Sequence, residues 1–421
     1  MIRRLALQTT PSLVLSAGLP RSDLPPRLRP HATLGVLDVT KYFGSTSGGI
    51  KTYLLEKARY VGVRPGLRQV MVIPGVDDRI DTSNGSRIYR LRGPRIPMNP
   101  PYRFLLATSS FRRVVDHERP NVIEVGSPFL VPWLARLANR RLQAPMVWFY
   151  HSHIPRLAVP DPDQARFGHR LAERLLSKYV RHLGDRFPVV ICASDFAARE
   201  LADLGVSRIA RVPLGVDLHT FHPGRRAWGA ETRRDVGLPD GPVALFVGRF
   251  AGEKRLDVLL DAWAEVERRC RVRLALLGAG PIEPSLRTHP YASRVLWLPY
   301  QSSRDRMADL MAAVDFVVAP GPNETFGLAV LESLASGTPV LSVDEGGAAE
   351  LVASSGAGVR YRSGEPAHCA EMAVVLAKSN LPALGAKARA YACQGHGWDT
   401  VFDQLFRVYG DVAGVRPDPR G

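Results

Sequence analysis

The chain has 421 residues, of which 45% are hydrophobic and 23% are charged, proportions that are typical of a soluble globular protein with room for two domains. No apolar run reaches the roughly 18 residues that span a bilayer. The four cysteines follow no CxxC spacing, and this scatter argues for reduced thiols in the cytoplasm and against structural zinc or disulfides. The net charge of +16 lies wholly in residues 1–230, where 35 Lys and Arg face 17 Asp and Glu.

Residues 1–30 differ from the rest of the chain in composition. They carry five arginines and several prolines, but a single acid, Asp23. The apolar stretch at residues 12–19 is short for a signal peptide and contains two serines. We therefore predict that residues 1–30 form a disordered leader outside the fold.

From His31 onward, short β-rich runs alternate with amphipathic helical stretches such as residues 49–60 and 128–140. Buried strands are predicted in the first half at residues 33–39, 68–74, 121–125 and 144–150. Buried strands are predicted in the second half at residues 242–248, 272–278, 294–299, 315–320 and 338–343. Alternation over such lengths predicts an α/β protein with two Rossmann-like domains, each a doubly wound parallel sheet, facing across a cleft.

The predicted domain boundary is the segment at residues 212–224, which is punctuated by proline and glycine and separates the basic half from the neutral half. It gives a first domain at residues 31–213 and a second at residues 225–395. Because ligands of open α/β sheets bind beyond the carboxyl ends of the strands, the loops that follow each strand are the places to look for chemistry.

One such loop follows the strand that ends at Gly248. Arg249 comes next, and Lys254 lies five residues later at the start of an amphipathic helix. A guanidinium takes two oxygens at once and an ammonium acts as a point charge, so this pair predicts a diphosphate site. The alternative is a solvated Lys254 and an Arg249 that pairs with Glu253.

A second loop carries Glu324 just before a predicted helix at residues 326–336, with Glu332 inside that helix. The first N–H groups of the helix, at Phe326, Gly327 and Leu328, are predicted to bind phosphate. Glu332 is about six residues into the helix, or roughly 9 Å, which suits a ribose beyond the phosphate. Glu324 is then placed to accept hydroxyls of the group that the phosphate carries.

Glu324 and Glu332, together with the strand, loop and helix that carry them, resemble the E-x7-E signature of retaining family-4 glycosyltransferases, which have the GT-B fold. The segment around Arg249 and Lys254 resembles that family's phosphate-binding loop. The stretch at residues 43–61 resembles its N-terminal glycine loop, with Gly48 and Gly49 matching the pair that faces the diphosphate. Residues 398–413 resemble the last helix, which in this family packs back on the first domain.

The resemblance is looser in the first half. Family members have a histidine at the strand end occupied here by His151, near the reacting sugar, and His153 follows two residues later. His151 matches better by position, but the assignment between the two stays open. Glu124 lies in a loop that often touches the acceptor, and Tyr300 and Gln301 lie in the loop expected to meet the nucleotide base.

The resemblance implies transfer of a hexose of mannose or glucose type from a nucleotide sugar, with retention of anomeric configuration and without a metal or other cofactor. Overall likeness to bacterial mannosyltransferases favours GDP-mannose as donor over a UDP-hexose. A D-x-D triplet at residues 161–163 sits in a proline-rich stretch, where it indicates a turn rather than a metal site.

In this family the first domain takes the acceptor, so the basic half is the acceptor half. Segments at residues 101–115 and 165–184 mix Arg and Lys with Leu, Phe and Tyr, a pattern suited to an anionic bilayer surface. We therefore expect a lipid-linked or saccharide acceptor and peripheral association with the inner face of the membrane. The alternative is a set of ordinary packed helices with basic outer faces.

Two other functions are alternatives to glycosyl transfer. A nucleotide-sugar epimerase shares the fold, although the context of the two glutamates disfavours it. A nucleic-acid-binding protein is suggested by the pI of 10.1, but the charge is dispersed and no recognised binding module is present, so we expect no nucleic-acid partner.

Overall fold

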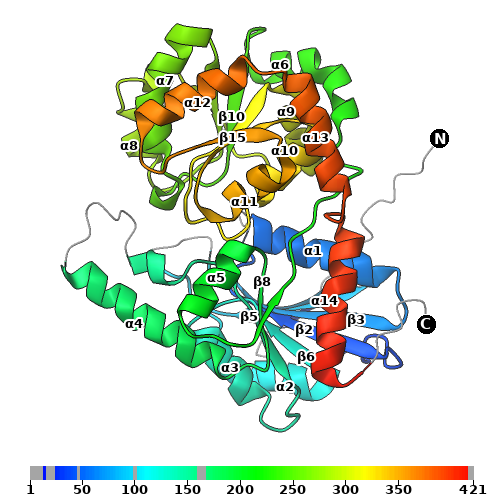
Figure 1. The fold of residues 1–421 in the computed structure, drawn as a ribbon. Helices are drawn as coiled ribbons and strands as arrows, with labels where there is room; N and C mark the ends of the chain where they lie inside the picture. Colours follow the sequence, from blue (N-terminus) through cyan, green and yellow to red (C-terminus); the bar gives the residue numbers. More distant parts are fainter. Residues whose placement is uncertain (1–12, 16–23, 45–47, 98–101, 159–166, 416–421) are drawn as a thin grey trace.

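The structure is a computed structural model that describes residues 13–15, 24–44, 48–97, 102–158 and 167–415. It consists of two α/β domains, one above the other in Figure 1, each built around a twisted sheet with helices on both faces. This arrangement confirms the predicted fold class. Among the described helices, none combines the length and the apolar character that a bilayer crossing requires.

The sheet of the first domain has the strand order β1-β4-β5-β3-β2-β6-β7-β8-β9 in the described residues. Its strands are β1 (Leu13–Leu15), β2 (Leu34–Val39), β3 (Leu67–Gly75), β4 (Asp78–Ser83), β5 (Ser86–Arg92), β6 (Val122–Val125), β7 (Met146–Phe149), β8 (Val190–Cys192) and β9 (Ile209–Arg211). Its helices are α1 (Gly49–Gly62), α2 (Thr108–Glu118), α3 (Leu130–Ala138), α4 (Phe167–Gly184) and α5 (Asp195–Asp203). The central strands β2 and β3 are buried along their whole length, as a parallel sheet covered on both faces requires.

A β-hairpin interrupts the parallel order at one edge of this sheet. Strand β4 pairs antiparallel with β5 through a tight turn at Asn84 and Gly85, which have φ angles of 49° and 74°. Asn-Gly is the preferred pair for a turn that needs positive φ at both central positions. The strand prediction omitted this hairpin, although the dipeptide that signals it is present in the sequence.

The prediction that residues 1–30 lie outside the fold is wrong for the part that the structure describes. Strand β1 pairs with β4 at the sheet edge. The guanidinium of Arg29 donates to the main-chain oxygens of Val61, Gly62 and Arg64 at distances of 2.7–2.9 Å. These bonds satisfy carbonyl groups at the end of α1 and just beyond it, so Arg29 caps that helix. The predictions for residues 1–12 and 16–23 lie outside the described residues.

The sheet of the second domain has the order β12-β11-β10-β13-β14-β15, and its neighbouring strands pair in parallel. Its strands are β10 (Val243–Val247), β11 (Arg273–Leu277), β12 (Leu296–Leu298), β13 (Phe316–Ala319), β14 (Val340–Val343) and β15 (Gly358–Tyr361). Its helices are α6 (Gly229–Val236), α7 (Leu256–Cys270), α8 (Glu283–Arg287), α9 (Arg304–Ala313), α10 (Leu328–Ala335), α11 (Gly346–Ser355), α12 (Pro366–Ala377) and α13 (Leu381–Cys393). The predicted strands of this half all appear, each shorter by two or three residues.

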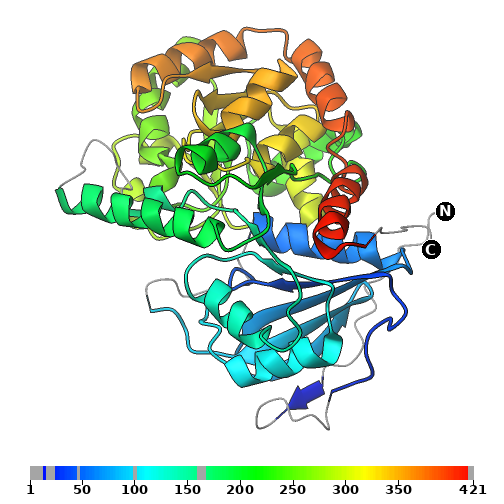
Figure 2. The ribbon, with the colours of Figure 1, turned by 60° about the horizontal axis from the view of Figure 1, so that its bottom comes forward.

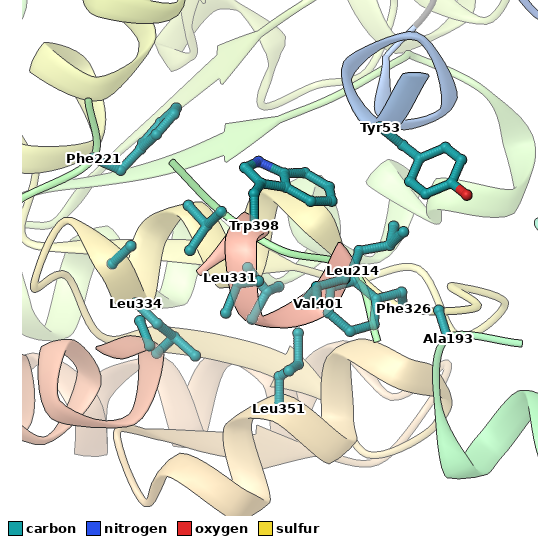
Figure 3. Packing of buried hydrophobic residues seen from close by; sticks show 14 of the residues in the cluster. Tyr53, Ala193, Leu214, Phe221, Phe326, Leu331, Leu334, Leu351, Trp398 and Val401 are labelled. Atoms are coloured by element: carbon teal, nitrogen blue, oxygen red, sulfur yellow. The ribbon is translucent and has the colours of Figure 1, made fainter. Parts of the chain in front are cut away.

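The chain passes between the domains twice, and the two passages lie side by side (Figure 1). The N–H of Val216 on the outward passage donates to the carbonyl oxygen of His396 on the return, at 2.8 Å. Gly215 packs so closely on Trp398 that a Cβ would lie 2.7 Å from the indole ring, which explains the glycine. In Figure 3 this indole is surrounded by apolar residues of both domains, which form one continuous core.

Helix α14 (Trp398–Ala413) follows the return passage and lies beside α1 on the first domain (Figure 2). Beneath it is a buried polar cluster in which the Lys57 ammonium lies 2.7 Å from Asp38 and 3.2 Å from Glu124. The same ammonium donates to the Tyr409 hydroxyl of α14 at 2.8 Å, and the Tyr53 hydroxyl donates to Glu124 at 2.9 Å. Glu124 is therefore a structural group, and the expectation that it touches the acceptor is wrong.

Candidate active site

The first feature of the site is the pairing of two loops that sequence analysis treated separately. Strands β10 and β13 are parallel neighbours, so the loops beyond their carboxyl ends lie side by side. The Lys254 ammonium on one loop contacts the Glu324 carboxylate on the other. Both side chains are partly exposed and both line a small cavity. A cation and an acid therefore share one end of the sheet, where a ligand can separate them.

The Glu324 loop is held rigidly by the helix that follows the next strand. The Gly347 N–H, at the start of α11, donates to the Glu324 carbonyl oxygen at 2.6 Å. Gly346 has a φ of +85°, and a Cβ there would lie 2.7 Å from the Pro322 carbonyl oxygen. Gly327, with a φ of +93°, begins α10 in a conformation that L side chains rarely adopt. These glycines fix Glu324 relative to the first N–H groups of α10.

Glu332 lies on α10 and is buried, with one carboxylate oxygen 2.6 Å from the guanidinium of Arg304 at the start of α9. Burial raises the pKa of this carboxyl, and Arg304 opposes that rise. The guanidinium also lies over the Phe221 ring, with its central carbon 4.6 Å from the ring centre. Glu332 is a site residue that the sequence predicts, whereas Arg304 was not predicted.

The first domain reaches this loop through His151, which follows β7. The Thr325 hydroxyl donates to the His151 carbonyl oxygen at 2.8 Å, and the Ser194 hydroxyl donates to the Thr325 carbonyl oxygen at 2.6 Å. The imidazole stacks on Phe149 with ring centres 4.1 Å apart. Burial, reinforced by the charge of Lys57, lowers its pKa to about 3, so the ring is neutral near pH 7.

The second histidine belongs to a different group of side chains. His153 Nδ1 lies 3.1 Å from a carboxylate oxygen of Glu200, which also accepts from the Tyr150 hydroxyl at 2.6 Å. Burial raises the pKa of Glu200 to about 7 and lowers that of His153 to about 4. Because His153 pairs within its own domain and His151 contacts the Glu324 loop, the geometry favours His151 as the site residue.

The remaining predicted residues surround this centre. A Cβ on Gly49, at the start of α1, would lie 3.6 Å from the Leu328 side chain, and a Cβ on Gly48 would meet open space. The structure thus brings the glycine pair of the first domain to the start of α10. Arg249 is exposed beyond β10, and Tyr300 is 45% exposed beyond β12, two strands away in the sheet. Phe326 is buried in the core between the domains.

Two family models match the chain. Residues 241–379 match the model described as glycosyl transferases group 1, and residues 47–220 match the one described as glycosyltransferase family 4. A GDP-mannose-dependent alpha-(1-6)-phosphatidylinositol dimannoside mannosyltransferase of Mycobacterium tuberculosis is 30% identical, over 79% of this chain and 86% of that relative. A GDP-mannose-dependent alpha-mannosyltransferase of Mycolicibacterium smegmatis is 31% identical, over 70% of this chain and 75% of that relative.

Solved structures support the same assignment at the level of fold. Sucrose-phosphate synthase from Thermosynechococcus elongatus superposes with a TM-score of 0.69 at 20% identity, covering 90% of this chain and 99% of that one. WaaG, a glycosyltransferase involved in lipopolysaccharide biosynthesis, superposes with a TM-score of 0.67 at 16% identity, covering 90% and 100%. This chain therefore belongs to the glycosyltransferases, with a family 4 domain followed by a group 1 domain, and it has the GT-B fold.

Proposed function

We propose that this glycosyltransferase moves a hexose from a nucleotide sugar to a glycan or glycolipid acceptor. The observation that carries the proposal is the contact between Lys254 and Glu324 at the end of the second sheet, joined through Thr325 to His151 of the first domain. A diphosphate that binds Lys254 would release Glu324 to accept sugar hydroxyls. The matched family models and the curated relatives favour neither an epimerase nor a nucleic-acid-binding protein.

GDP-mannose is the donor we propose first, because the relatives described above are named as GDP-mannose-dependent enzymes. A UDP-hexose is the second candidate. The base would lie near Tyr300 and Gln301, and the Gln301 side chain accepts the Ser303 N–H at 3.0 Å. Glu332 would accept the ribose hydroxyls while Arg304 holds the carboxylate in place.

We further propose that transfer retains anomeric configuration and needs no metal. Arg249, Lys254 and the first N–H groups of α10 would stabilise the charge that develops on the leaving diphosphate. The neutral His151 imidazole would act as a hydrogen-bonding group at the transferred sugar, while Gly48 and Gly49 would face the diphosphate from the first domain.

Thermal melting with GDP, UDP, ADP and the corresponding sugars tests the donor assignment. A ligand at about 100 times its dissociation constant stabilises the folded state by roughly 2.7 kcal/mol, which melting resolves readily. We expect a shift with GDP that disappears in Lys254→Ala and persists in Lys387→Ala, a control on an exposed lysine of α13. If none of the three diphosphates shifts the wild-type transition, the donor assignment fails.

We also propose that helices α3 and α4 form a membrane-facing surface of the first domain. Large apolar side chains are exposed there, on Leu130, Trp133, Leu137, Leu171 and Leu175. Exposed basic residues lie on the same two helices and just beyond their ends, at Arg136, Arg140, Arg170, Arg174, Lys178, Arg181 and Arg186. The Arg186 guanidinium lies 5.2 Å from the centre of the Trp133 ring, so the two kinds of side chain are interleaved. Apolar groups within a basic rim match the chemistry of an anionic bilayer surface.

Sedimentation with vesicles tests this surface. We expect binding to vesicles that contain phosphatidylglycerol, weak binding to pure phosphatidylcholine, and loss of binding in Leu171→Glu/Leu175→Glu. Val63→Glu and Val76→Glu, on exposed apolar residues elsewhere on the first domain, serve as matched controls. Equal sedimentation with both kinds of vesicle would refute the proposal.

A further inference from the structure

Two lysines near the site have no acidic partner within the described residues although both are partly buried. Lys41 follows β2, and its ammonium lies 5.1 Å from the centre of the Tyr42 ring and 5.8 Å from that of Phe129. In the part of the chain that the structure describes, no carboxylate lies at ion-pair distance from it. Burial alone lowers the pKa of Lys41. A desolvated ammonium without a counter-charge is costly, and an anionic ligand would offset that cost.

Lys51 is the second of these lysines and lies in the first turn of α1. Its ammonium is 5.8 Å from the centre of the Phe43 ring, and Arg90 lies at the same distance from that ring. Burial, and then the charge of Arg90, lower the pKa of Lys51. A cation in the first turn of a helix is unfavourable for the helix itself. Arg90 forms an ion pair with Asp81. Lys51 has no carboxylate at ion-pair distance in the described part of the chain.

The loop that carries Lys41 is fixed next to His151. The Thr40 and Ser127 hydroxyls lie 2.8 Å apart, and the Lys41 N–H donates to the Ser127 hydroxyl at 3.0 Å. Between them, a Cβ on Gly126 would lie 3.4 Å from the Thr40 side chain and 3.5 Å from His151 Nε2. The main chain of Lys41 is therefore held through Ser127, next to Gly126, the position that borders the imidazole proposed to meet the transferred sugar.

Aromatic rings complete this wall. Phe129 stacks on Tyr179 of α4 with ring centres 5.6 Å apart, and Tyr42 packs edge-on against Tyr102. Phe129 has a φ of 68°, which is strained for a bulky residue and is maintained by the surrounding structure, including the Tyr179 hydroxyl that donates to its carbonyl oxygen. Rings of this kind offer flat faces on which a sugar or polyol can pack, beside the Lys41 ammonium.

We propose that Lys41 binds a phosphate group on the acceptor, which makes the acceptor a phosphorylated polyol or glycan. The proposal rests on the function proposed above, because it assumes that the acceptor enters beside His151. Two sources supply the same chemistry: a water-soluble polyol phosphate and the phosphodiester of a lipid headgroup. Tyr179 lies on α4, which also carries Leu171 and Leu175 of the membrane-facing surface, so a headgroup could reach Lys41 from that side.

The test is calorimetric titration of the full chain with inorganic phosphate and with glycerol phosphate, in the presence of saturating GDP to fill the donor site. We expect binding in the wild type and a loss of about tenfold to a hundredfold in Lys41→Gln, the range for a lost hydrogen bond to a charged group. Lys51→Gln should lose less, and Lys387→Gln should match the wild type. Equal affinity in wild type and Lys41→Gln overturns the proposal.

Nucleotide binding separates this proposal from the proposed function. If Lys41→Gln binds GDP normally but loses phosphate, the acceptor assignment is supported; if it loses GDP instead, Lys41 serves the donor and the proposal is wrong. If wild-type protein binds no nucleoside diphosphate, the proposed function fails, and phosphate titration without GDP still reports on Lys41. Vesicles that contain phosphatidylinositol distinguish the two sources of phosphate. If these vesicles compete with inorganic phosphate for the protein and phosphatidylcholine vesicles do not, the ligand of Lys41 is the lipid headgroup.

Discussion

The Thr325 hydroxyl of the second domain donates a hydrogen bond to the His151 carbonyl oxygen of the first domain, at 2.8 Å. Thr325 directly follows Glu324, so the bond joins the strand-end loop of one sheet to that of the other. Its effect is to set the separation between the imidazole and the carboxylate. Either group alone would be positioned only by its own domain.

Removing this bond should lower turnover and leave donor affinity unchanged. In Thr325→Val the side chain keeps its size but loses the donor, and small misplacements of reacting groups cost up to about a hundredfold in rate. We expect kcat to fall about tenfold while the dissociation constant for GDP stays the same. Thr288→Val, which removes a local hydroxyl bond in the second domain, is the control. A raised dissociation constant with normal kcat would contradict this role.

Lys254→Ala should lose most activity without unfolding. One donor to a developing negative charge contributes about 100- to 1000-fold in rate. The variant leaves Glu324 without its partner, but that carboxylate is 31% exposed and water can solvate it. Steady-state kinetics at saturating donor, beside circular dichroism, check this. Wild-type turnover in the variant would refute the site assignment.

The two glutamates should differ in kinetic effect. Glu332→Gln should mainly weaken donor binding, because Glu332 is proposed to hold the ribose, whereas Glu324→Gln should mainly depress kcat, because Glu324 is proposed to meet the transferred sugar. Glutamine keeps the shape in both cases, and in Glu332→Gln its oxygen still accepts from Arg304. The opposite division between KM and kcat would mean that the two roles are exchanged.

Acid should destabilise the protein in part through His151. Its pKa falls from the ordinary 6.5 to about 3 on folding, so below pH 6.5 the unfolded chain takes up a proton that the folded chain refuses. The folded state then loses about 1.4 kcal/mol per pH unit, or about 2 kcal/mol at pH 5. Asp38, whose pKa burial raises to about 6, acts in the opposite direction. The comparison of wild type with His151→Phe isolates the histidine, and the variant should show the flatter pH dependence of melting. Identical pH dependence would contradict the shift.

Lys57→Met should destabilise the folded state strongly. It leaves Asp38 and Glu124 buried without a cation, and breaking a buried ion pair in this way costs about 3–5 kcal/mol. Tyr409→Phe removes one hydrogen-bonding hydroxyl from the same cluster and should cost about 1 kcal/mol. Chemical denaturation measures both. Similar midpoints for Lys57→Met and wild type would show that the cluster adds little to stability.

Local pattern predicted the sheets well because strand identity depends on neighbouring residues. The buried runs of β2, β3 and β10 are largely apolar, so their pattern identifies them, whereas the parallel pairing of β10 with β13, which brings their two loops together, was not predicted. The β4–β5 hairpin was missed although Asn84 and Gly85 signal it.

Local sequence pattern could not predict contacts between residues that are far apart in the chain. Arg304 meets Glu332 only because α9 and α10 pack in the same domain, and no spacing in the sequence encodes that pair. Glu124 looked available for an acceptor because its partners Lys57 and Tyr409 come from 67 residues before it and 285 residues after it. Partners of buried charges depend on tertiary packing, which sequence periodicity does not report.

The position of α14 has a consequence for synthesis. The domain that leaves the ribosome first contains Asp38, Lys57 and Glu124, but the Tyr409 hydroxyl that completes their hydrogen bonding is made 285 residues after the last of them. Until residues 398–413 emerge, that domain lacks a helix over its apolar residues. The first domain to be translated is therefore the last to be finished, and a ribosome that stalls within the second domain would expose an incomplete core in the first.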